Sequence, residues 1–338
     1  MSAALVSVAA QRIADHARAH RLTSVRVIFH GGEPLLAGPE SVVDAARKVR
    51  AAVDARVGVD CWVQTNGTLL DGASLDALEH IGIRLGVSLD GDLAAHDRSR
   101  RYANGRGSYH AVAEALLQLM KRPNIYSGLL CVVDLRADPI ATYEAMLEFT
   151  PPVIDFLLPH GNWSSPPPGR PDSGATPYAE WLIAVFDRWY GTASRETGVR
   201  LFDEIIHLLL GGKSATEAVG LTPTSLVVVE TDGSIEQSDS LKSAYHGAAA
   251  TGLHIARDSF DAALGLPQVA ATQLGLDALS ADCLRCPLHQ VCGAGLYAHR
   301  YLAGSGFRNR SVYCQDLYAL ITHIRSHLVG DLRARRRP

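Results

Sequence analysis

Short apolar runs alternate with helical patterns over the first half of the chain. Five runs rich in β-branched residues predict strands, at 25–29, 61–64, 85–89, 126–133 and 153–158. The segments between them predict four helices, at 40–53, 74–81, 109–120 and 141–149. Strands that alternate with helices of about ten to fifteen residues indicate β-α units on a parallel sheet. The strands are apolar along their length, as expected for a sheet that is covered on both faces.

Proline and glycine interrupt this pattern between residues 161 and 177. Three consecutive prolines at 166–168 cannot lie inside a helix or a central strand. We therefore expect a first domain at 1–160, a linker at 161–177, a second domain at 178–330 and a basic tail at 331–338.

The second domain is expected to combine helices with one hairpin. Helical patterns cover 178–190 and 202–210, and a final helix carries one apolar stripe between residues 317 and 328. Valine-rich residues precede an Asp-Gly dipeptide within 226–235, a sequence that is typical of a hairpin turn.

Composition and charge exclude several classes of protein. The chain has 338 residues, of which 47% are hydrophobic and 20% charged, as in a folded core. Its 32 basic and 35 acidic residues give a net charge of -3, so we expect neither nucleic acid nor a membrane as partner. The apolar run at 3–10 follows no basic residue, and no run reaches the roughly 18 apolar residues of a membrane helix. We expect a cytoplasmic protein.

Small polar residues follow the first three predicted strands. In parallel β-α folds the carboxyl ends of the strands meet where ligands bind. A glycine pair lets the backbone approach a ligand closely, and an adjacent carboxylate suits an ammonium group. Each segment could instead be an ordinary turn or helix cap. The candidate cofactor-binding residues at these strand ends are Gly31, Gly32, Glu33, Thr65, Asn66, Ser88 and Asp90.

His160 follows the fifth predicted strand. It is a further candidate for contact with a substrate or cofactor, although it could equally mark the start of the linker. We expect no other active site, because the usual hydrolase, zinc-protease and phosphate-binding motifs are missing from the sequence. We also expect no paired metal-ligand spacing among the 14 histidines.

The six cysteines fall into two groups. Cys61 and Cys131 stand alone on predicted strands, and the other four lie in the last fifth of the chain. This distribution argues against a secreted disulfide scaffold. Four thiolates suit either structural zinc or a 4Fe-4S cluster, and their spacing alone leaves both open. The four candidate metal ligands are Cys283, Cys286, Cys292 and Cys314.

Four motifs, in order along the chain, resemble the signatures of radical SAM enzymes. They are FHGGEPLL at 29–36, QTNGTLL at 64–70, VSLDG at 87–91 and GRGSY at 105–109. More narrowly, they resemble the radical SAM/SPASM peptide maturases that cyclise ribosomal precursor peptides, including the cyclophane-forming group. The resemblance covers about residues 9–327 and therefore almost the whole chain.

The resemblance implies an α/β fold with two parts. The first is a partial (β/α)6 radical SAM barrel that lacks its first strand, and the second is an α+β SPASM-type iron-sulfur domain. Gly31, Gly32 and Glu33 would hold the amino group of S-adenosylmethionine, and Ser88 would lie near its ribose or carboxylate. The four clustered cysteines would hold one auxiliary 4Fe-4S cluster. The implied reaction crosslinks side chains of a ribosomal precursor peptide.

Two departures concern the second domain. Family members with two auxiliary clusters carry further cysteines where this chain has Ser238 and Leu296. The first auxiliary cluster is therefore expected to be absent. Asp239 stands where some relatives place a proton-accepting carboxylate, which makes it the candidate catalytic residue. It could instead be a solvent-facing carboxylate beside Lys242.

A larger departure concerns the catalytic cluster. The 338 residues contain no Cys-x3-Cys-x2-Cys motif, and residues 7–20 resemble the helix that follows the motif in the family. The chain as written is therefore expected to lack the catalytic cluster and to be inactive. It could be a shortened enzyme, a degenerate relative that binds a peptide or an adenosyl ligand around a structural metal site, or a protein recruited to another reaction. An open sheet edge would favour a homodimer or a partner strand.

Overall fold

A sheet of six parallel strands forms the centre of the molecule in the computed structural model, which describes residues 1–171, 174–223 and 226–335. The strands follow one another in chain order across the sheet, and each pairs in parallel with the next. Their bounds are β1 (Ser24–Phe29), β2 (Gly58–Thr65), β3 (Arg84–Ser88), β4 (Tyr126–Val132), β5 (Val153–Leu157) and β6 (Gly198–Val199).

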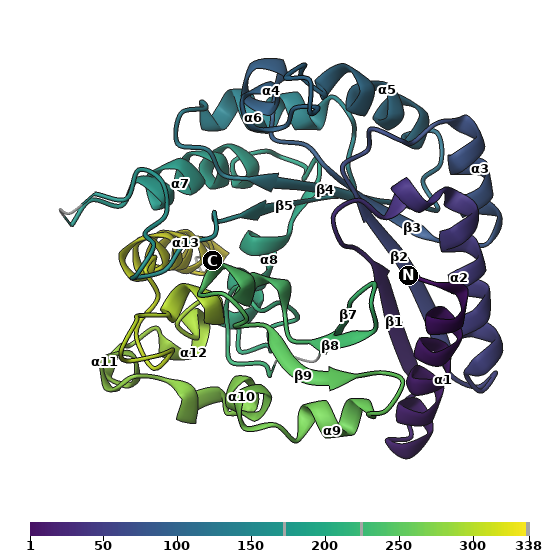
Figure 1. Cartoon of the computed structure of the whole chain (residues 1–338). Helices are drawn as coiled ribbons and strands as arrows, with labels where there is room; N and C mark the ends of the chain where they lie inside the picture. Colours follow the sequence, from purple (N-terminus) through teal and green to yellow (C-terminus); the bar gives the residue numbers. More distant parts are fainter. Residues whose placement is uncertain (172–173, 224–225, 336–338) are drawn as a thin grey trace.

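Helices cover the outer face of this curved sheet (Figure 1). Aspartates at the N-terminal ends of three of them accept a hydrogen bond from the backbone amide three residues on, which satisfies one free donor of each helix. The curved arrangement confirms the predicted partial barrel. The elements are α1 (Ala3–Ala19), the 3-10 helix η1 (Pro34–Ala37), α2 (Pro39–Ala52), α3 (Gly72–His80), α4 (Leu93–Ser99), α5 (Tyr109–Leu119) and α6 (Pro139–Leu147).

The second half of the chain starts and ends with longer helices. Between them lie a small antiparallel sheet and a series of short helices. The longer helices are α7 (Pro177–Tyr190), α8 (Arg200–Leu209) and α13 (Cys314–Arg335). The small sheet consists of β7 (Val228–Val229), β8 (Ser234–Glu236) and β9 (Ala250–His254). The short helices are η2 (Asp239–Ser243), α9 (Phe260–Leu264), α10 (Pro267–Ala270), η3 (Ala271–Gln273), η4 (Gly275–Ala278), α11 (Ala281–Arg285), α12 (His289–Cys292) and η5 (Tyr297–Arg300).

The predicted hairpin is present, and its turn contains the expected Asp-Gly dipeptide. Gly233 has a φ of 95°, in the region that favours glycine, and β7 pairs antiparallel with β8. The third strand of this sheet, β9, has no clear alternating pattern and was not predicted from the sequence.

The hydrophobic core crosses the predicted linker at 161–177, of which residues 172 and 173 lie outside the described ranges. Phe186 of α7 and Ile321 of α13 belong to the same buried cluster as Leu85 of β3. Strand β6 extends the main sheet from beyond the linker. Packing thus joins α7, β6 and α8 to the sheet rather than to a second domain. The sequence could not show this because β6 has only two residues.

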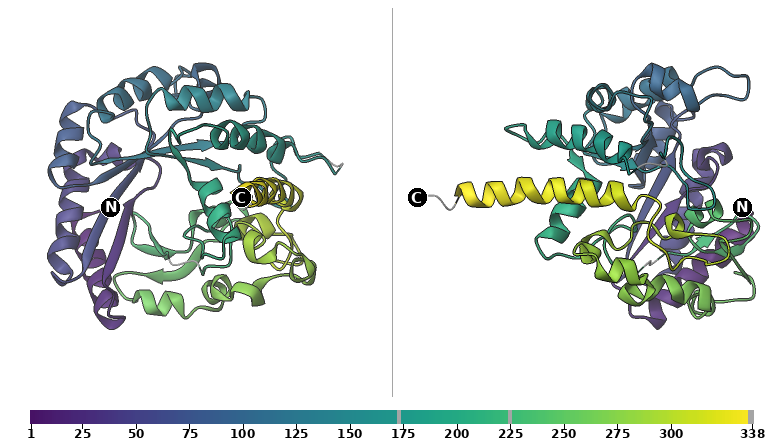
Figure 2. Two further views of the ribbon diagram at one scale, coloured as in Figure 1. Left: turned by 180° about the vertical axis from the view of Figure 1, so that it is seen from behind. Right: turned by 90° about the vertical axis from the view of Figure 1, so that its left-hand side faces the viewer.

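The basic tail predicted at 331–338 also differs from the structure. Helix α13 continues to Arg335, so most of that segment is helical, and residues 336–338 lie outside the described ranges. In the side view of Figure 2, the C-terminal part of α13 extends away from the rest of the molecule. No helix in the described ranges is long and apolar enough to cross a membrane.

Helix α1 packs against two different parts of the protein. Ala10 and Ala14 form a small core with Val49 and Val53, in and just after α2. On another side, Leu5, Val8, Ala9 and Ile13 contact a cluster formed by buried residues of the second half: Ile235, Ile255, Phe260 and Ala263. The start of the chain is therefore connected to both halves.

Gly128 provides a test of how the sheet is packed. Its φ is 141°, and a Cβ at this position would lie 2.2 Å from the carbonyl oxygen of Val153 on β5. We expect Gly128→Ala to lower the free energy of unfolding by about 2–4 kcal/mol, from backbone strain and overpacking. Urea denaturation measures this change. Gly330→Ala on α13 is the control, because a Cβ there meets no atom within 4 Å and its helix should not be weakened. Equal stability of the two variants would contradict this account of the packing.

Candidate cofactor-binding and metal-binding sites

The loop after β1 presents open backbone at the carboxyl edge of the sheet. Gly31 has a φ of 121°, which favours glycine, and its amide donates a 2.6 Å hydrogen bond to Nδ1 of His30. A Cβ added at either Gly31 or Gly32 would meet no protein atom within 4 Å. The two glycines therefore leave room for another molecule beside the backbone.

The carboxylate of Glu33 ties this loop to the end of β2. Its Oε1 accepts a 2.7 Å hydrogen bond from the Thr65 hydroxyl and a 3.1 Å bond from the Leu35 amide. Its Oε2 accepts a 2.7 Å bond from the Asn66 amide. One charged group thus holds two strand ends together, with hydrogen bonds of the strong, charge-assisted kind. The predicted residues Gly31, Gly32, Glu33, Thr65 and Asn66 do come together.

Ser88, at the end of β3, joins the same edge through a residue that we did not single out. Nε2 of Gln64 donates a 3.2 Å hydrogen bond to the Ser88 hydroxyl. Gly86 lies opposite Gln64 in the strand pairing, and a Cβ there would stand 2.4 Å from the Gln64 Oε1. Gly86 therefore leaves the space that Gln64 needs to reach Ser88. The only sequence signal was the position of Gln64 at a strand end.

Asp90 makes contacts within the protein. Its buried carboxylate accepts hydrogen bonds from the Arg100 guanidinium, at 2.6 and 3.3 Å, and from the Val132 amide at 3.0 Å. These bonds connect the loop after β3 to the end of β4. The observed role of Asp90 is to stabilise this edge of the sheet, and its predicted contact with a cofactor stays a prediction.

His160 lies at the junction between the sheet and the segment that carries the four cysteines. Its side chain reaches solvent, but surrounding atoms desolvate it and lower its pKa below the usual value. The neighbouring His299 is only 3% exposed, and burial, followed by the charges of His160 and Arg300, lowers its pKa to about 3. Within the described part of the chain, Nε2 of His299 has no hydrogen-bond partner. A ligand contact by His160 remains a prediction.

The four clustered cysteines line one cavity of about 220 Å³. Burial, and then the nearby thiols of Cys314, Cys283 and Cys286, raise the pKa of Cys292 to about 12. Burial likewise raises the pKa of Cys314. All four are free thiols, and Leu288 and Tyr318 also line the cavity. A bound cation would favour the deprotonated thiolates that burial alone disfavours.

Arg300 holds the turn that follows Cys292, and our sequence analysis missed it. Its buried guanidinium donates hydrogen bonds to the carbonyl oxygens of Gly293, Ala294 and Gly295, at 2.6, 3.2 and 2.8 Å. These three residues all have φ between 58° and 63°, so the carbonyls turn towards one point. Arg300 thereby fixes the backbone that presents Cys292 to the cavity. An arginine eight residues after a cysteine gives no such signal in a sequence.

Asp239 lies in a cluster of charges around one lysine. The Lys242 ammonium lies 2.8 Å from Asp239, 2.9 Å from Glu236 and 2.5 Å from Glu230. The hydrogen bonds that Lys242 donates to these carboxylates, the bond to Asp239 first, raise the pKa of Lys242. The Asp239 side chain is 42% exposed. It thus lies beside Lys242, as one of our two interpretations expected, and its role as a proton acceptor is a prediction.

The chain is similar in sequence to several known proteins. No protein-family model matches it. It is 28% identical over 222 residues to a cysteine-type anaerobic sulfatase-maturating enzyme of Clostridium perfringens, a match that covers 62% of this chain. It is 25% identical over 286 residues to a serine-type anaerobic sulfatase-maturating enzyme of Klebsiella aerogenes, which covers 83% of this chain and 68% of the relative.

The fold is also similar to that of solved structures. The structure described as native anSMEcpe with bound AdoMet and Kp18Cys peptide superposes with a TM-score of 0.83 at 22% identity, over 99% of this chain and 91% of that one. Streptococcus suis SuiB superposes with a TM-score of 0.58 at 13% identity, over 91% of this chain and 70% of that one. The chain is thus similar in sequence to anaerobic sulfatase-maturating enzymes and similar in fold to anSMEcpe and SuiB.

These similarities confirm the resemblance to radical SAM peptide maturases that the four motifs indicated, while the cyclophane-forming type stays a prediction. The α/β fold with a partial radical SAM barrel is confirmed as well. The chain spans 58% of the length of the Clostridium perfringens relative, so its activity, substrate and partners remain matters for proposal.

The bonds of Glu33 lead to a prediction about the strand-end site. Glu33→Gln places an NH2 group opposite a backbone or hydroxyl donor, because an amide offers only one acceptor oxygen. We expect the free energy of unfolding to fall by about 1–3 kcal/mol. We also expect faster amide hydrogen exchange at Asn66. Glu114→Gln, on the exposed face of α5, is the control that should leave both measurements unchanged. Unchanged exchange at Asn66 in Glu33→Gln would contradict the assigned contact.

Proposed function

We propose that this chain binds S-adenosylmethionine at the carboxyl edge of its sheet and acts in the maturation of a peptide. The observation that carries the proposal is the anchored Glu33 carboxylate beside two glycines with open space. The similarity to sulfatase-maturating enzymes supports it.

The chemistry of the loop fits an amino acid that carries an ammonium group. A carboxylate can accept about four hydrogen bonds, and Glu33 accepts three within the protein. One position is left for an incoming ammonium. Gly31 and Gly32 permit the ligand to approach the protein backbone closely. The Ser88 hydroxyl accepts a hydrogen bond from Gln64 and can still donate one to the ligand. Anchoring Glu33 and Ser88 before binding lowers the entropic cost of recognition.

The spacing of the four thiols around the cavity favours an iron-sulfur cluster rather than a single zinc ion. A tetrahedral zinc with Zn–S bonds of about 2.3 Å holds its sulfurs about 3.8 Å apart. Three groups of potential metal ligands in the described residues have ligand atoms within 4.8 Å of one another, and none includes a cysteine. The four thiols therefore surround a wider space than one zinc ion needs. A cubane cluster holds its ligands at its corners, farther apart, and suits four thiolates.

The protein's own residues would have distinct tasks. Cys283, Cys286, Cys292 and Cys314 would hold the cluster, which when bound supplies one-electron transfer. Arg300 would keep the Cys292 turn in place. Asp239 would accept a proton from the peptide, with Lys242 holding its carboxylate in position. Each of these roles is part of the proposal.

The most specific part of the proposal is the kind of modification that the peptide receives. The curated relatives are named cysteine-type and serine-type sulfatase-maturating enzymes, so we place maturation of a sulfatase ahead of the crosslink that the motifs suggested. Crosslinking that forms a cyclophane stays a prediction. The fold similarity to SuiB bound to its precursor peptide SuiA is compatible with a peptide partner.

A second candidate function is binding without radical chemistry. The observation that favours this function is that the 338 residues contain no Cys-x3-Cys-x2-Cys motif. We therefore assign the reduction of S-adenosylmethionine to no residue of this chain. One assay separates catalysis from binding. The protein with bound S-adenosylmethionine is kept under anaerobic, reducing conditions, and cleavage of the S-adenosylmethionine is measured.

Gly32→Ala tests the proposed binding of S-adenosylmethionine. The added methyl group meets no protein atom within 4 Å, and Gly32 has no positive φ, so the folded protein should keep its melting temperature. A ligand beside the backbone would collide with the methyl group. We expect binding, measured by isothermal titration calorimetry, to weaken at least tenfold, about 1.4 kcal/mol. Gly330→Ala should bind like the wild type. No detectable binding by the wild type, or equal binding by both variants, would refute this part of the proposal.

The metal content of the chain tests the cluster separately. Protein prepared anaerobically should contain about four irons and matching sulfide per chain. Cys286→Ser should lose most of this iron, whereas Cys131→Ala, which removes a thiol buried in β4, should retain it. Elemental analysis and sulfide assay give the result. Zinc in place of iron, with the same dependence on Cys286, would show that the site is a zinc site.

A further inference from the structure

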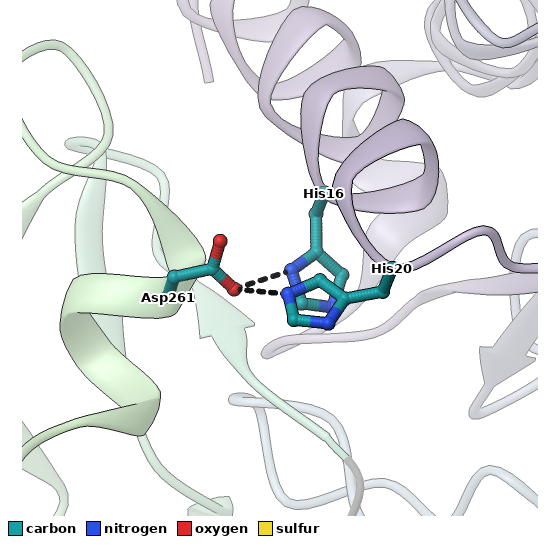
Figure 3. Close-up of side chains that lie close together, drawn as sticks. All are labelled: His16, His20 and Asp261. Carbon is teal, nitrogen blue, oxygen red and sulfur yellow. Dashed lines mark hydrogen bonds and ion pairs between the residues drawn. The ribbon is translucent and has the colours of Figure 1, made fainter.

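Two histidines and one aspartate converge on the surface, outside the sites described above (Figure 3). Nδ1 of His16 lies 2.9 Å and Nε2 of His20 lies 2.7 Å from the same oxygen, Oδ1 of Asp261. All three ligand atoms lie within 4.8 Å of one another. Each side chain is partly exposed, by 24% for His16 and 48% for the other two.

The two histidines come together because of helical spacing. His16 and His20 are four residues apart at the C-terminal end of α1, so both point to one face. Their ring centroids are 4.4 Å apart. We expected no paired metal-ligand spacing among the histidines, and that expectation was wrong. A pair four residues apart on a helix is a known way to bind a metal ion with both imidazoles.

Asp261 is brought to this pair by the packing of α1 on the second half of the chain. Leu5, Val8, Ala9 and Ile13 of α1 pack against the cluster that contains Phe260, the residue before Asp261. Nε of Arg12 also donates a 2.8 Å hydrogen bond to the carbonyl oxygen of Ile255. The arrangement is thus held by a hydrophobic interface and a backbone contact that do not involve the three side chains themselves.

The charge of Asp261 is not balanced by a permanent cation. In the described residues, its ion-pair partners are the two histidines alone, and no lysine or arginine pairs with it. The hydrogen bond with His20, followed by the nearby charges of both histidines, lowers the pKa of Asp261, so its carboxylate is ionised at neutral pH. An ionised carboxylate between two imidazole side chains is a ligand set that a divalent cation would complete.

A second group of the same composition differs in detail. His323 and His327 of α13 are also four residues apart and face Asp187 of α7. Nε2 of His323 lies 2.6 Å from Asp187 Oδ1, but Nε2 of His327 lies 3.5 Å away. Both of these imidazoles pack against the aromatic ring of Phe186. The group therefore functions in the packing of α7 against α13, and the convergence is tighter at His16 and His20.

We propose that His16, His20 and Asp261 form a binding site for one divalent transition-metal ion, with Zn²⁺ as the reference ion. Imidazole and carboxylate ligands suit zinc, at bond lengths of about 2.0–2.2 Å. Such bonds set the ligand atoms of a tetrahedral site about 3.3 Å apart, so the two nitrogens need to move only about half an ångström from the Asp261 oxygen. The fourth position faces solvent, where a water molecule completes the coordination.

The proposed ion would connect segments that are distant in the sequence. Asp261 is 245 residues from His16 and 241 from His20. An ion at this point fastens the end of α1 to α9, at the end of the hydrophobic interface between them. The bound ion would hold the first helix of the chain on the second half. This attachment would require both the metal ion and histidine nitrogens free of protons to bind it.

Zinc binding by matched variants tests the proposal. Wild type, His20→Gln, Asp261→Asn and His80→Gln are dialysed against a series of buffered Zn²⁺ concentrations, and bound zinc is measured by elemental analysis. His80 is an exposed histidine on α3, away from the group, and the four thiols are the same in every protein. Anomalous diffraction at the zinc edge locates the ion. Circular dichroism checks that each variant is folded.

The expected result is one zinc fewer per chain in His20→Gln and Asp261→Asn than in the wild type, or at least tenfold weaker binding of that zinc. His80→Gln should match the wild type, and an anomalous peak should lie between His16, His20 and Asp261. Equal zinc content in all four proteins would overturn the proposal, as would an equal loss in His80→Gln. An anomalous peak beside Asp187 with none beside Asp261 would also overturn it.

Discussion

The docking of α13 on α7 and the sheet sets the position of the thiol cavity in the second half of the chain. The Asp316 carboxylate, near the start of α13, accepts hydrogen bonds of 3.0 Å from the amides of Tyr178 and Ala179 at the start of α7. The Tyr313 hydroxyl donates a 2.7 Å bond to the carbonyl of Pro159, just after β5. These contacts are reinforced by apolar side chains of both helices in the main core. Cys314 is therefore fixed with respect to the strand ends.

The strand-end site and the thiol cavity differ in how much they depend on this docking of α13. The strand-end site is built from short-range features, namely two glycines and a carboxylate that links β1 to β2. The thiol cavity needs four cysteines from three helical segments, and it needs Arg300 to hold the turn after Cys292. The first site would survive small shifts of α13. The second would not, because Cys314 is the first residue of that helix.

Helix α1 adds a constraint of another kind. One side packs on α2, and another packs on the small sheet and α9, so the helix joins the beginning of the chain to its second half. Its last turn carries His16 and His20, whose nitrogens meet Asp261. A surface group of this kind can regulate how firmly two segments are held without touching the strand-end site.

The alternating strands and helices can be read from the amino-acid sequence, because buried parallel strands must be apolar and helices need a repeating apolar face. The sequence also located the glycine–glutamate loop and the four cysteines, since local backbone freedom and ligand type are encoded in neighbouring residues. The strands at 25–29 and 85–89 were placed within one residue of β1 and β3.

Tertiary structure alone decided the rest. Strand β6 is too short to leave a pattern, and the shared core across the predicted linker depends on where α7 and α13 pack. The contact of Gln64 with Ser88 requires two strands to lie side by side, with a glycine between them. The group of His16, His20 and Asp261 joins residues more than 240 positions apart. No local pattern can encode such contacts, because they exist only once the hydrophobic core has brought the segments together.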